Sequence, residues 1–180
     1  MKPLQLMDEA SIRRSLTRIA YEILEKNNGV DSVTLIGIRS RGEDIAKRLA
    51  DRLEQIEGKK VPMLSLDIHS YRDDLIEKIQ DEVVFSQADQ KWITDRVIVL
   101  VDDVLYTGRT IRAAMDAVMD YGRPKRIHLA TLIDRGHREL PIRPDFIGKN
   151  IPTAQSEKVT VHLKERDGKD CVYLERPDEN

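Results

Sequence analysis

The sequence predicts an α/β fold built on a doubly wound, mostly parallel sheet, and two observations lead to it. Short continuous apolar runs, typical of strands covered on both faces, alternate with segments whose apolar residues recur at helical spacing. The runs are VTLIGI (33–38), VIVLV (97–101) and IHLATLI (127–133). Because neighbouring parallel strands need a crossover between them, the alternation predicts helices on both faces of one sheet.

Three amphipathic segments are predicted to be the helices. The first lies between a capping Asp8 and a stop at Asn28-Gly29. The second covers about residues 45–56, and the third covers about residues 111–118 and closes at Gly122.

The remaining segments have weaker patterns. Residues 64–68 alternate as a strand, whereas residues 71–92 show no sustained period and predict an extended, flexible loop or a hairpin. Residues 134–153 are too rich in proline and glycine for a helix. Residues 158–163 and 171–175 alternate as the two strands of a hairpin.

Length and composition predict one domain over residues 1–180. Charged residues make up 34% of the chain but nearly cancel at a net −2, so a nucleic-acid site would need a local basic patch. The start, MKPLQLMDEA, lacks the apolar core of a signal peptide, and no apolar run approaches the roughly 20 residues that span a bilayer. We expect a cytoplasmic protein without a membrane partner.

Two acids and a short loop follow the apolar run at 97–101. Asp102 and Asp103 come where ligands bind in open parallel sheets, at the carboxyl end of a strand. The next loop opens a helix, where N–H groups, Gly108 and the hydroxyls of Thr107 and Thr110 suit a phosphate. The acids would repel that phosphate, so they should bind sugar hydroxyls or organise a hydrated Mg²⁺. Alternatively, the acids merely end a strand and the loop merely caps a helix.

Residues 97–110, VIVLVDDVLYTGRT, resemble the phosphoribosyl pyrophosphate (PRPP) signature of type I phosphoribosyltransferases. The resemblance implies that family's fold, with catalytic roles for Asp102 and Asp103. It implies Mg²⁺ as cofactor, bound mainly through PRPP, with no direct histidine or cysteine ligand. The implied PRPP or UMP contacts in the loop are Val104, Leu105, Tyr106, Thr107, Gly108, Arg109 and Thr110.

The same resemblance gives roles to segments outside the signature. A loop at 37–42 would meet the pyrophosphate, with Arg39 as a catalytic group and Ser40 and Arg41 as further contacts. The 71–92 segment would close as a lid through Arg72 and exclude water. The terminal segments would form a small hood.

The base is expected to be a pyrimidine. Purine enzymes of this family commonly carry an acid just before the Thr-Gly of the signature, where Tyr106 stands in this chain. The resemblance assigns Phe146 to stacking on uracil and the backbone of Ile147 to reading the uracil edge. The alternative is that Phe146 belongs to the core.

Within the family, the chain most resembles regulators of pyrimidine operons that are also uracil phosphoribosyltransferases. Matching stretches include YRDDL, VDDVLYTGRT, DRGHRELPIR and GKNIPTAQSEKV. The implied reaction converts uracil and PRPP into UMP and diphosphate. The implied second role is UMP-dependent binding of a stem-loop in the mRNA leader of pyrimidine genes, by a homodimer or a larger homo-oligomer.

Basic residues on two segments are candidates for the RNA contacts, because phosphates dominate nucleic-acid binding. The candidates are Arg14, Thr17 and Arg18 on the first helix, and His137, Arg138, Arg143 and Lys149 in the later segment. The simpler alternative is that these side chains are solvated and pair with acids. Two other functions stay open: a nucleotide sensor with negligible catalysis, and a salvage enzyme that binds no RNA.

Overall fold

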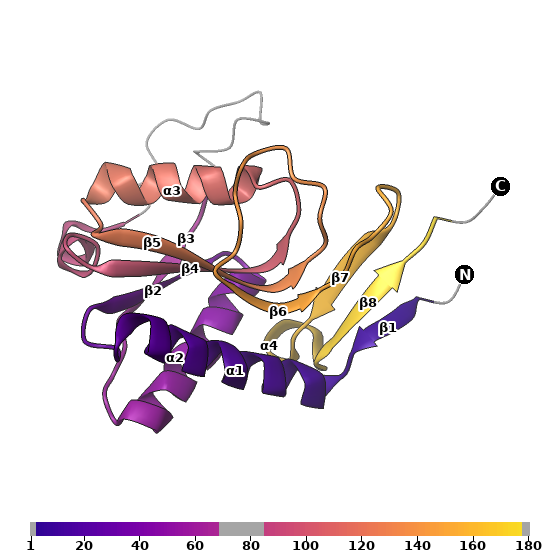
Figure 1. The fold of residues 1–180 in the computed structure, drawn as a ribbon, viewed down its shortest axis with the longest axis horizontal. Coiled ribbons are helices and arrows are strands. Elements are labelled where there is room, and N and C mark those ends of the chain that lie inside the picture. The colour runs from indigo at the N-terminus through magenta and orange to yellow at the C-terminus, as the bar shows by residue number, and fades with distance from the viewer. Residues whose placement is uncertain (1–2, 69–84, 178–180) are drawn as a thin grey trace.

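The structure is a computed structural model that describes residues 3–68 and 85–177. A five-stranded sheet with the order β3-β2-β4-β5-β6 forms its centre, and all neighbouring strands are parallel (Figure 1). The strands are β2 Val33–Ile38, β3 Met63–Leu66, β4 Val97–Leu105, β5 Arg126–Asp134 and β6 Phe146–Asn150. The predicted fold class is confirmed.

Helices cover both faces of this sheet, as a doubly wound fold requires. On one face lie α1 (Glu9–Asn27) and α2 (Arg41–Glu57), and on the other lies α3 (Arg109–Tyr121) (Figure 1). The predicted ends of the first helix are confirmed. The Asp8 side chain accepts a hydrogen bond from the backbone N–H of Ser11, and Asn28 leaves the helix in the left-handed conformation at φ 52°.

Both ends of the chain meet in a second, antiparallel sheet beside the first (Figure 1). This hood contains β1 (Leu4–Met7), β8 (Cys171–Glu175) and β7 (Lys158–His162) in that order, with the short helix α4 (Lys164–Asp167) between β7 and β8. The predicted hairpin of residues 158–163 and 171–175 is confirmed. The strand β1 was not predicted, because four residues are too few to display a period.

Two predicted loops contain regular structure. Residues 85–92 belong to the predicted flexible segment, yet Gln87–Trp92 forms a 3₁₀ helix, η2, with a capping box between Ser86 and Asp89. Its flanking residues Phe85 and Ile93 are buried, so the loop prediction is wrong for this part. The segment at 134–153 contains β6, hidden by its proline-rich flank, although the prediction that it forms no helix is confirmed.

No helix in the described ranges, 3–68 and 85–177, is both long and apolar enough to cross a membrane.

Candidate active site at the carboxyl ends of β2 and β4

The acid pair lies near the end of β4, between β2 and β5. Asp102 is 8% exposed, and its Oδ1 accepts a hydrogen bond from the backbone N–H of Asp103 at 2.9 Å. Burial and the adjacent Asp103 carboxylate raise the pKa of Asp102 well above its usual value. Asp103 is less buried and its Oδ1 accepts from the Val104 N–H at 2.9 Å. The two acids therefore occupy different environments, and Asp103 is the one more open to a ligand.

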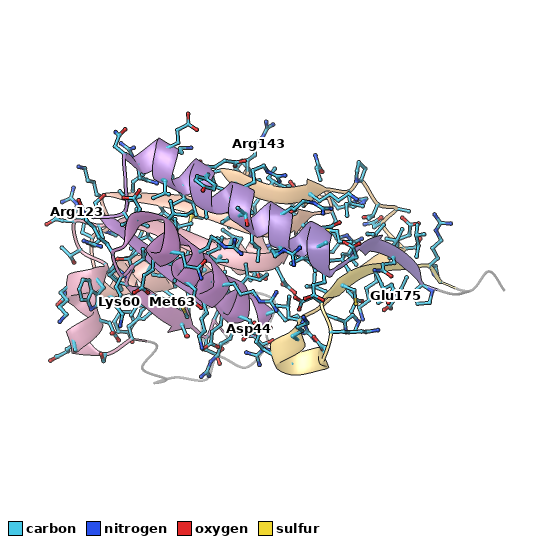
Figure 2. The ribbon with its side chains drawn as sticks, turned by 90° about the horizontal axis from the view of Figure 1, so that it is seen from below. Asp44, Lys60, Met63, Arg123, Arg143 and Glu175 are labelled. Atoms are coloured by element: carbon cyan, nitrogen blue, oxygen red, sulfur yellow. The ribbon has the colours of Figure 1, made fainter. Side chains whose placement is uncertain are left out.

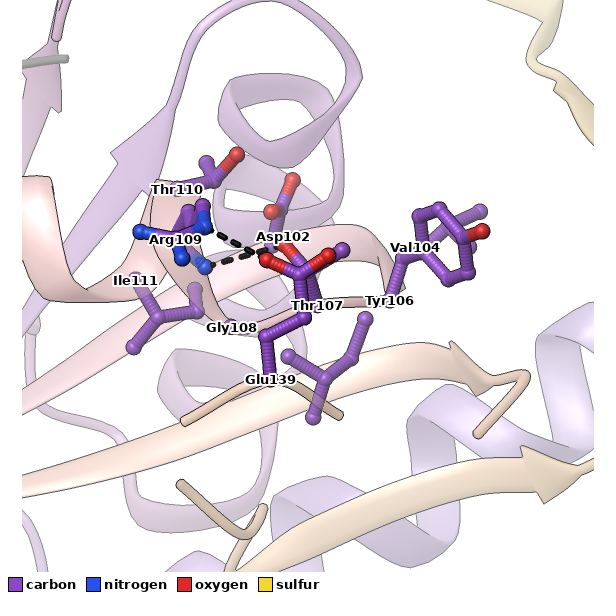
Figure 3. Close-up of a pocket in the computed structure, with 10 residues that line it drawn as sticks. Asp102, Val104, Tyr106, Thr107, Gly108, Arg109, Thr110, Ile111 and Glu139 are labelled. Carbon is purple, nitrogen blue, oxygen red and sulfur yellow. Dashed lines mark hydrogen bonds and ion pairs between the residues drawn. The ribbon is translucent and has the colours of Figure 1, made fainter. Parts of the chain in front are cut away.

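A cavity of about 490 Å³ surrounds the loop that follows the acids (Figure 3). It is lined by Asp102, residues 104–111 and Glu139. Gly108 precedes α3 at φ 93°, a conformation that glycine adopts without strain, and it offers no side chain to cap the helix. The Arg109 N–H donates to the Thr107 hydroxyl at 3.2 Å, and the next N–H groups of α3 are available to an anion beside the hydroxyls of Thr107 and Thr110. The structure brings the predicted signature residues around one cavity.

A second cavity of about 400 Å³ adjoins the first at the acid pair. It shares Asp102, Val104 and Thr110 with the first and adds Ile38, Arg39, Ser40, Asp67, Ile68 and Asp103. A glycine allows this arrangement, because a Cβ at Gly42 would lie 2.5 Å from the carbonyl oxygen of Val101. The first turn of α2 can therefore sit directly against the end of β4, so that two helix N-termini face one acid pair.

Two arginines of the 37–42 loop behave differently. The Arg39 side chain is 60% exposed and stands 3.6 Å from Asp67 and 3.9 Å from Glu43, distances too long for direct hydrogen bonds. Arg41 instead donates to Asp167 of α4 from Nη2 at 2.9 Å and from Nε at 3.3 Å, and it lines neither cavity. The prediction is corrected for the Arg41 side chain: the hood holds it, and only its backbone stands at the first turn of α2.

The hood makes a second contact with the same loop. Arg166 of α4 donates to the carbonyl oxygen of Ser40 at 3.0 Å and pairs with Asp44. Figure 2 shows Asp44 on α2 beside α4. No sequence pattern indicated these contacts, because the partners are more than 120 residues apart along the chain. The hood thus fixes the loop that carries Arg39.

The signature loop is held from another direction, by residues 135–142. Arg138 donates to the carbonyl oxygens of Tyr106 and Ile142, both at 2.8 Å, and to the Asp134 carboxylate at 2.6 Å. Its side chain is only 21% exposed. The prediction of a direct RNA contact by Arg138 is therefore corrected, because its guanidinium serves to join two loops.

Glu139 strengthens the same junction and was not predicted. Its backbone N–H donates to the carbonyl oxygen of Thr107 at 2.9 Å, and its carboxylate accepts from Arg109 at 2.6 Å (Figure 3). An acid 30 residues away from its partner carries no local signal of such a pair. Arg135 also contributes, with its guanidinium 4.1 Å from the centre of the Tyr106 ring.

The predicted uracil contacts do not lie at the acid pair. Phe146 is 2% exposed and packs edge to face on His128, with ring centres 5.9 Å apart, so no base can stack on it. The Ile147 carbonyl oxygen accepts from Arg18 at 2.7 Å, and Ile147 lines a different cavity. The prediction for Phe146 is wrong in this structure, because an aromatic residue that opens a buried strand has the same local sequence as one that faces a ligand, whereas the role of the Ile147 backbone stays a prediction.

The other predicted RNA contacts lie on α1 and on the segment that ends in β6. Arg18 joins these elements by donating to the carbonyl oxygens of Ile147 and Gly148, and it also pairs with Glu22. The remaining candidates are exposed or partly exposed on these elements: Arg14, Thr17, His137, Arg143 and Lys149. Four of them make bonds to the backbone or to a hydroxyl: Arg14 with Ser11, Thr17 with Arg13, Lys149 with Leu6, and His137, whose Nε2 lies 2.6 Å from the Thr153 carbonyl oxygen.

Arg72 lies outside the described residues, as does most of the predicted lid. Within the described part of the chain, no three histidine, cysteine, aspartate or glutamate side chains form a group that could hold a metal ion.

Comparisons with known proteins identify the family of this chain. The family model described as phosphoribosyl transferase domain matches residues 4–166. A protein named bifunctional protein PyrR from Alkaliphilus metalliredigens is 56% identical over 174 residues, which cover 97% of this chain and 96% of that relative. A relative of the same name from Acetivibrio thermocellus is 57% identical over 170 residues, covering 94% and 92% of the two chains.

Solved structures show the same fold at low sequence identity. A mutant of the hypoxanthine phosphoribosyltransferase from Trypanosoma cruzi, in a ternary substrates complex, has a TM-score of 0.74 at 21% identity, with 95% of this chain and 94% of that chain covered. A hypoxanthine phosphoribosyltransferase from Staphylococcus aureus has a TM-score of 0.71 at 18% identity, with 97% and 92% covered. The chain belongs to the phosphoribosyl transferase family, together with the bifunctional PyrR proteins.

Proposed function

We propose that this chain transfers the phosphoribosyl group of PRPP to uracil, giving UMP and diphosphate, and that its UMP-bound form binds a stem-loop in the mRNA leader of pyrimidine genes. One observation carries the catalytic half. Two cavities share Asp102; one is bounded by the first turn of α3, and the other by Ser40, the residue that precedes α2. Such a pair of anion sites around two acids matches a ligand with phosphates on both sides of a sugar.

Each part of PRPP has a place in this arrangement. The 5′-phosphate lies against the first turn of α3, where it accepts hydrogen bonds from backbone N–H groups, Thr107 and Thr110. The pyrophosphate lies in the other cavity, near Arg39 and the first turn of α2. The acid pair between them accepts hydrogen bonds from the ribose hydroxyls, mainly at Asp103.

Catalysis in this proposal rests on position and charge. As the bond between C1 of the ribose and the pyrophosphate oxygen breaks, positive charge develops on the ribose and negative charge on the leaving group. The Asp103 carboxylate stabilises the first and Arg39 stabilises the second. A uracil nitrogen held against C1 completes the transfer, so no side chain needs to act as a nucleophile.

Mg²⁺ fits this site as a cofactor that arrives with PRPP. Asp67, Asp102 and Asp103 line one cavity without forming a three-ligand group of their own, and their carboxylates offer the oxygen atoms that Mg²⁺ prefers. In this proposal pyrophosphate, ribose and water supply most of the ligands. When bound, Mg²⁺ neutralises the charge of the leaving group.

The RNA half of the proposal is supported by the name of the relatives, bifunctional, and by the basic residues on α1 and on residues 137–149, the segment that ends in β6. The contacts of Arg138 and Glu139 offer a route from UMP to RNA, because they join the signature loop to the segment that carries His137 and Arg143. A ligand that orders one loop would thereby bias the other. We propose that UMP favours the RNA-competent arrangement in this way.

Release of pyrophosphate from uracil and PRPP tests the catalytic half. We expect turnover with uracil and little or none with hypoxanthine or guanine, which serve as controls, because Tyr106 replaces the acid expected in purine enzymes. Absence of turnover with uracil would favour the alternative of a nucleotide sensor. The proposal includes a cytoplasmic location and assembly into a homodimer or larger homo-oligomer, and sedimentation analysis tests the assembly.

A further inference from the structure

A third cavity, of about 510 Å³, opens at the carboxyl ends of β5 and β6. It shares no lining residue with the two cavities at the acid pair. Its wall is mixed: the apolar part comes from Leu140, Pro141, Ile142, Pro144 and Ile147, and polar and charged side chains form the rest. It is therefore a separate hollow that the proposed phosphoribosyl transfer does not use.

Two polar side chains of this hollow, Asp134 and Asn150, differ in whether they are already hydrogen-bonded within the protein. The Asp134 carboxylate accepts from Arg138 at 2.6 Å and from the Gly136 N–H at 3.1 Å, so its charge is already compensated. The Asn150 side chain is exposed, and no hydrogen bond joins it to any described residue. A free amide offers one acceptor and two donors to a ligand, whereas the acid offers little.

The rim of the hollow is basic. His137 and Arg143 are exposed or partly exposed and line it, and Lys149 precedes Asn150 on β6. Arg18 of α1 donates to the carbonyl oxygen of Ile147 in its wall. The hollow thus lies within the basic surface proposed for RNA, and the apolar part of its wall is flanked by positive charges that suit phosphates.

We propose that this hollow receives one unpaired nucleobase from the loop of the bound RNA, and that the Asn150 amide reads the edge of that base. The inference rests on the proposed RNA binding and specifies how the sequence is recognised. Sequence-specific RNA recognition commonly uses unstacked bases that leave the loop and enter protein pockets. Arg143 and Lys149 then bind the neighbouring phosphates, which supply affinity without sequence preference.

The test combines RNA and protein changes, with binding measured in the presence of UMP at fixed salt. Each unpaired loop nucleotide of a pyrimidine-gene leader stem-loop is replaced in turn by an abasic one. We expect one abasic position to weaken binding to the wild type about tenfold. Asn150→Ala should weaken binding of the intact RNA by a similar factor and should add little to the loss at that one position, because both changes remove the same contact.

Two further variants keep the result decisive. Asn150→Asp replaces the amide donors and should weaken binding at least as much as Asn150→Ala. Because Asn150 is exposed, both variants are expected to fold. Lys149→Gln is the charge control: it should weaken all the RNAs equally and flatten the salt dependence, which Asn150→Ala should leave unchanged.

If the wild type binds the leader and Asn150→Ala binds it equally well, the base pocket is wrong while RNA binding stands. Full additivity of Asn150→Ala with every abasic position would also overturn the inference. Failure of the wild type to bind any leader RNA would overturn the RNA half of the proposed function and this inference with it.

Discussion

Two loops at helix N-termini face the same acid pair, but different parts of the protein hold them. The loop before α2 is fixed by the hood, through Asp167 on Arg41 and Arg166 on the Ser40 carbonyl oxygen. The loop before α3 is fixed by the segment that follows β5, through Arg138 on the Tyr106 carbonyl oxygen and Glu139 on Arg109. Neither Ser40 nor Gly108 caps its helix with a side chain, and apart from the Arg109 N–H, which donates to the Thr107 hydroxyl, both helices leave N–H groups for a ligand.

The difference indicates a division of tasks. The hood-side loop bears the exposed Arg39 and would serve the leaving pyrophosphate, which matters only to catalysis. The signature loop would hold the phosphate that is present in both PRPP and UMP, and it is joined to the basic surface. Substitutions that loosen the loop before α2 should therefore affect the use of PRPP. Substitutions that loosen the contacts between the loop before α3 and the segment after β5 should instead affect the response of RNA binding to UMP.

The largest effect is expected at the acid between the loops. Asp103→Asn should lower the turnover of uracil and PRPP about 100-fold, because the charge that stabilises the ribose is lost while the hydrogen bond from the Val104 N–H can persist. Steady-state rates measure the loss, and circular dichroism checks the fold. Unchanged turnover would refute the role assigned to Asp103.

A smaller effect is expected on the hood side. The Arg41 guanidinium lowers the pKa of Asp167, which marks a favourable pair. Asp167→Asn should weaken it, loosen the loop and raise the KM for PRPP about five- to tenfold with little change in kcat. Glu165→Gln is the matched control, since Glu165 lies on the same helix but pairs with Arg48, away from the loop. Equal KM values for the two variants would argue against control of the loop by the hood.

On the signature side the expected effect is about two- to threefold, because exposed ion pairs contribute little. The side chains of Arg109 and Glu139 are 42% and 52% exposed. Glu139→Gln should reduce by that factor the ratio of RNA affinities measured with and without UMP. Asp116→Asn disrupts another exposed pair on α3, with Arg112, and should leave the ratio unchanged. A ratio that Glu139→Gln does not alter would remove this pair from the coupling.

The smallest effect is a pH-dependent change in stability at Asp102. Its pKa is raised in the folded state by burial and by Asp103, so the native protein loses stability as the pH rises from the unfolded value through the folded one. Asp102→Asn cannot ionise, and its amide oxygen can still accept from the Asp103 N–H. We expect its melting temperature to exceed that of the wild type by about 2–4 °C at pH 8 and to approach it near pH 4. A gap independent of pH would contradict this explanation.

Contiguous signals made much of the fold and site predictable. Apolar runs revealed the central strands, and Asp102, Asp103, Thr107 and Gly108 follow one of them within a few residues, so the local order of residues already places them together. The roles of Arg41 and Arg138 could not be predicted in the same way. Their partners are a distant carboxylate and a backbone carbonyl group, and tertiary packing alone brings them within reach.

Phe146 illustrates the other limit of sequence reasoning. Its neighbours, proline and aspartate before and isoleucine and glycine after, suggest an exposed turn. In the structure the Asp145 carboxylate accepts from the Leu129 N–H, and Gly148 packs so closely on β5 that a Cβ would lie 2.4 Å from the Leu132 carbonyl oxygen. These contacts draw the segment into the sheet as β6 and bury the ring.

The most direct test of the bifunctional account is the binding of a pyrimidine-gene leader stem-loop to the purified protein, titrated with and without UMP at fixed salt. We predict tighter, salt-sensitive binding when UMP is present, because in the proposed function UMP occupies the signature loop, which is joined to the basic surface. Binding that is weak and independent of UMP, or no binding at all, would contradict the account and leave a uracil phosphoribosyltransferase without a regulatory role.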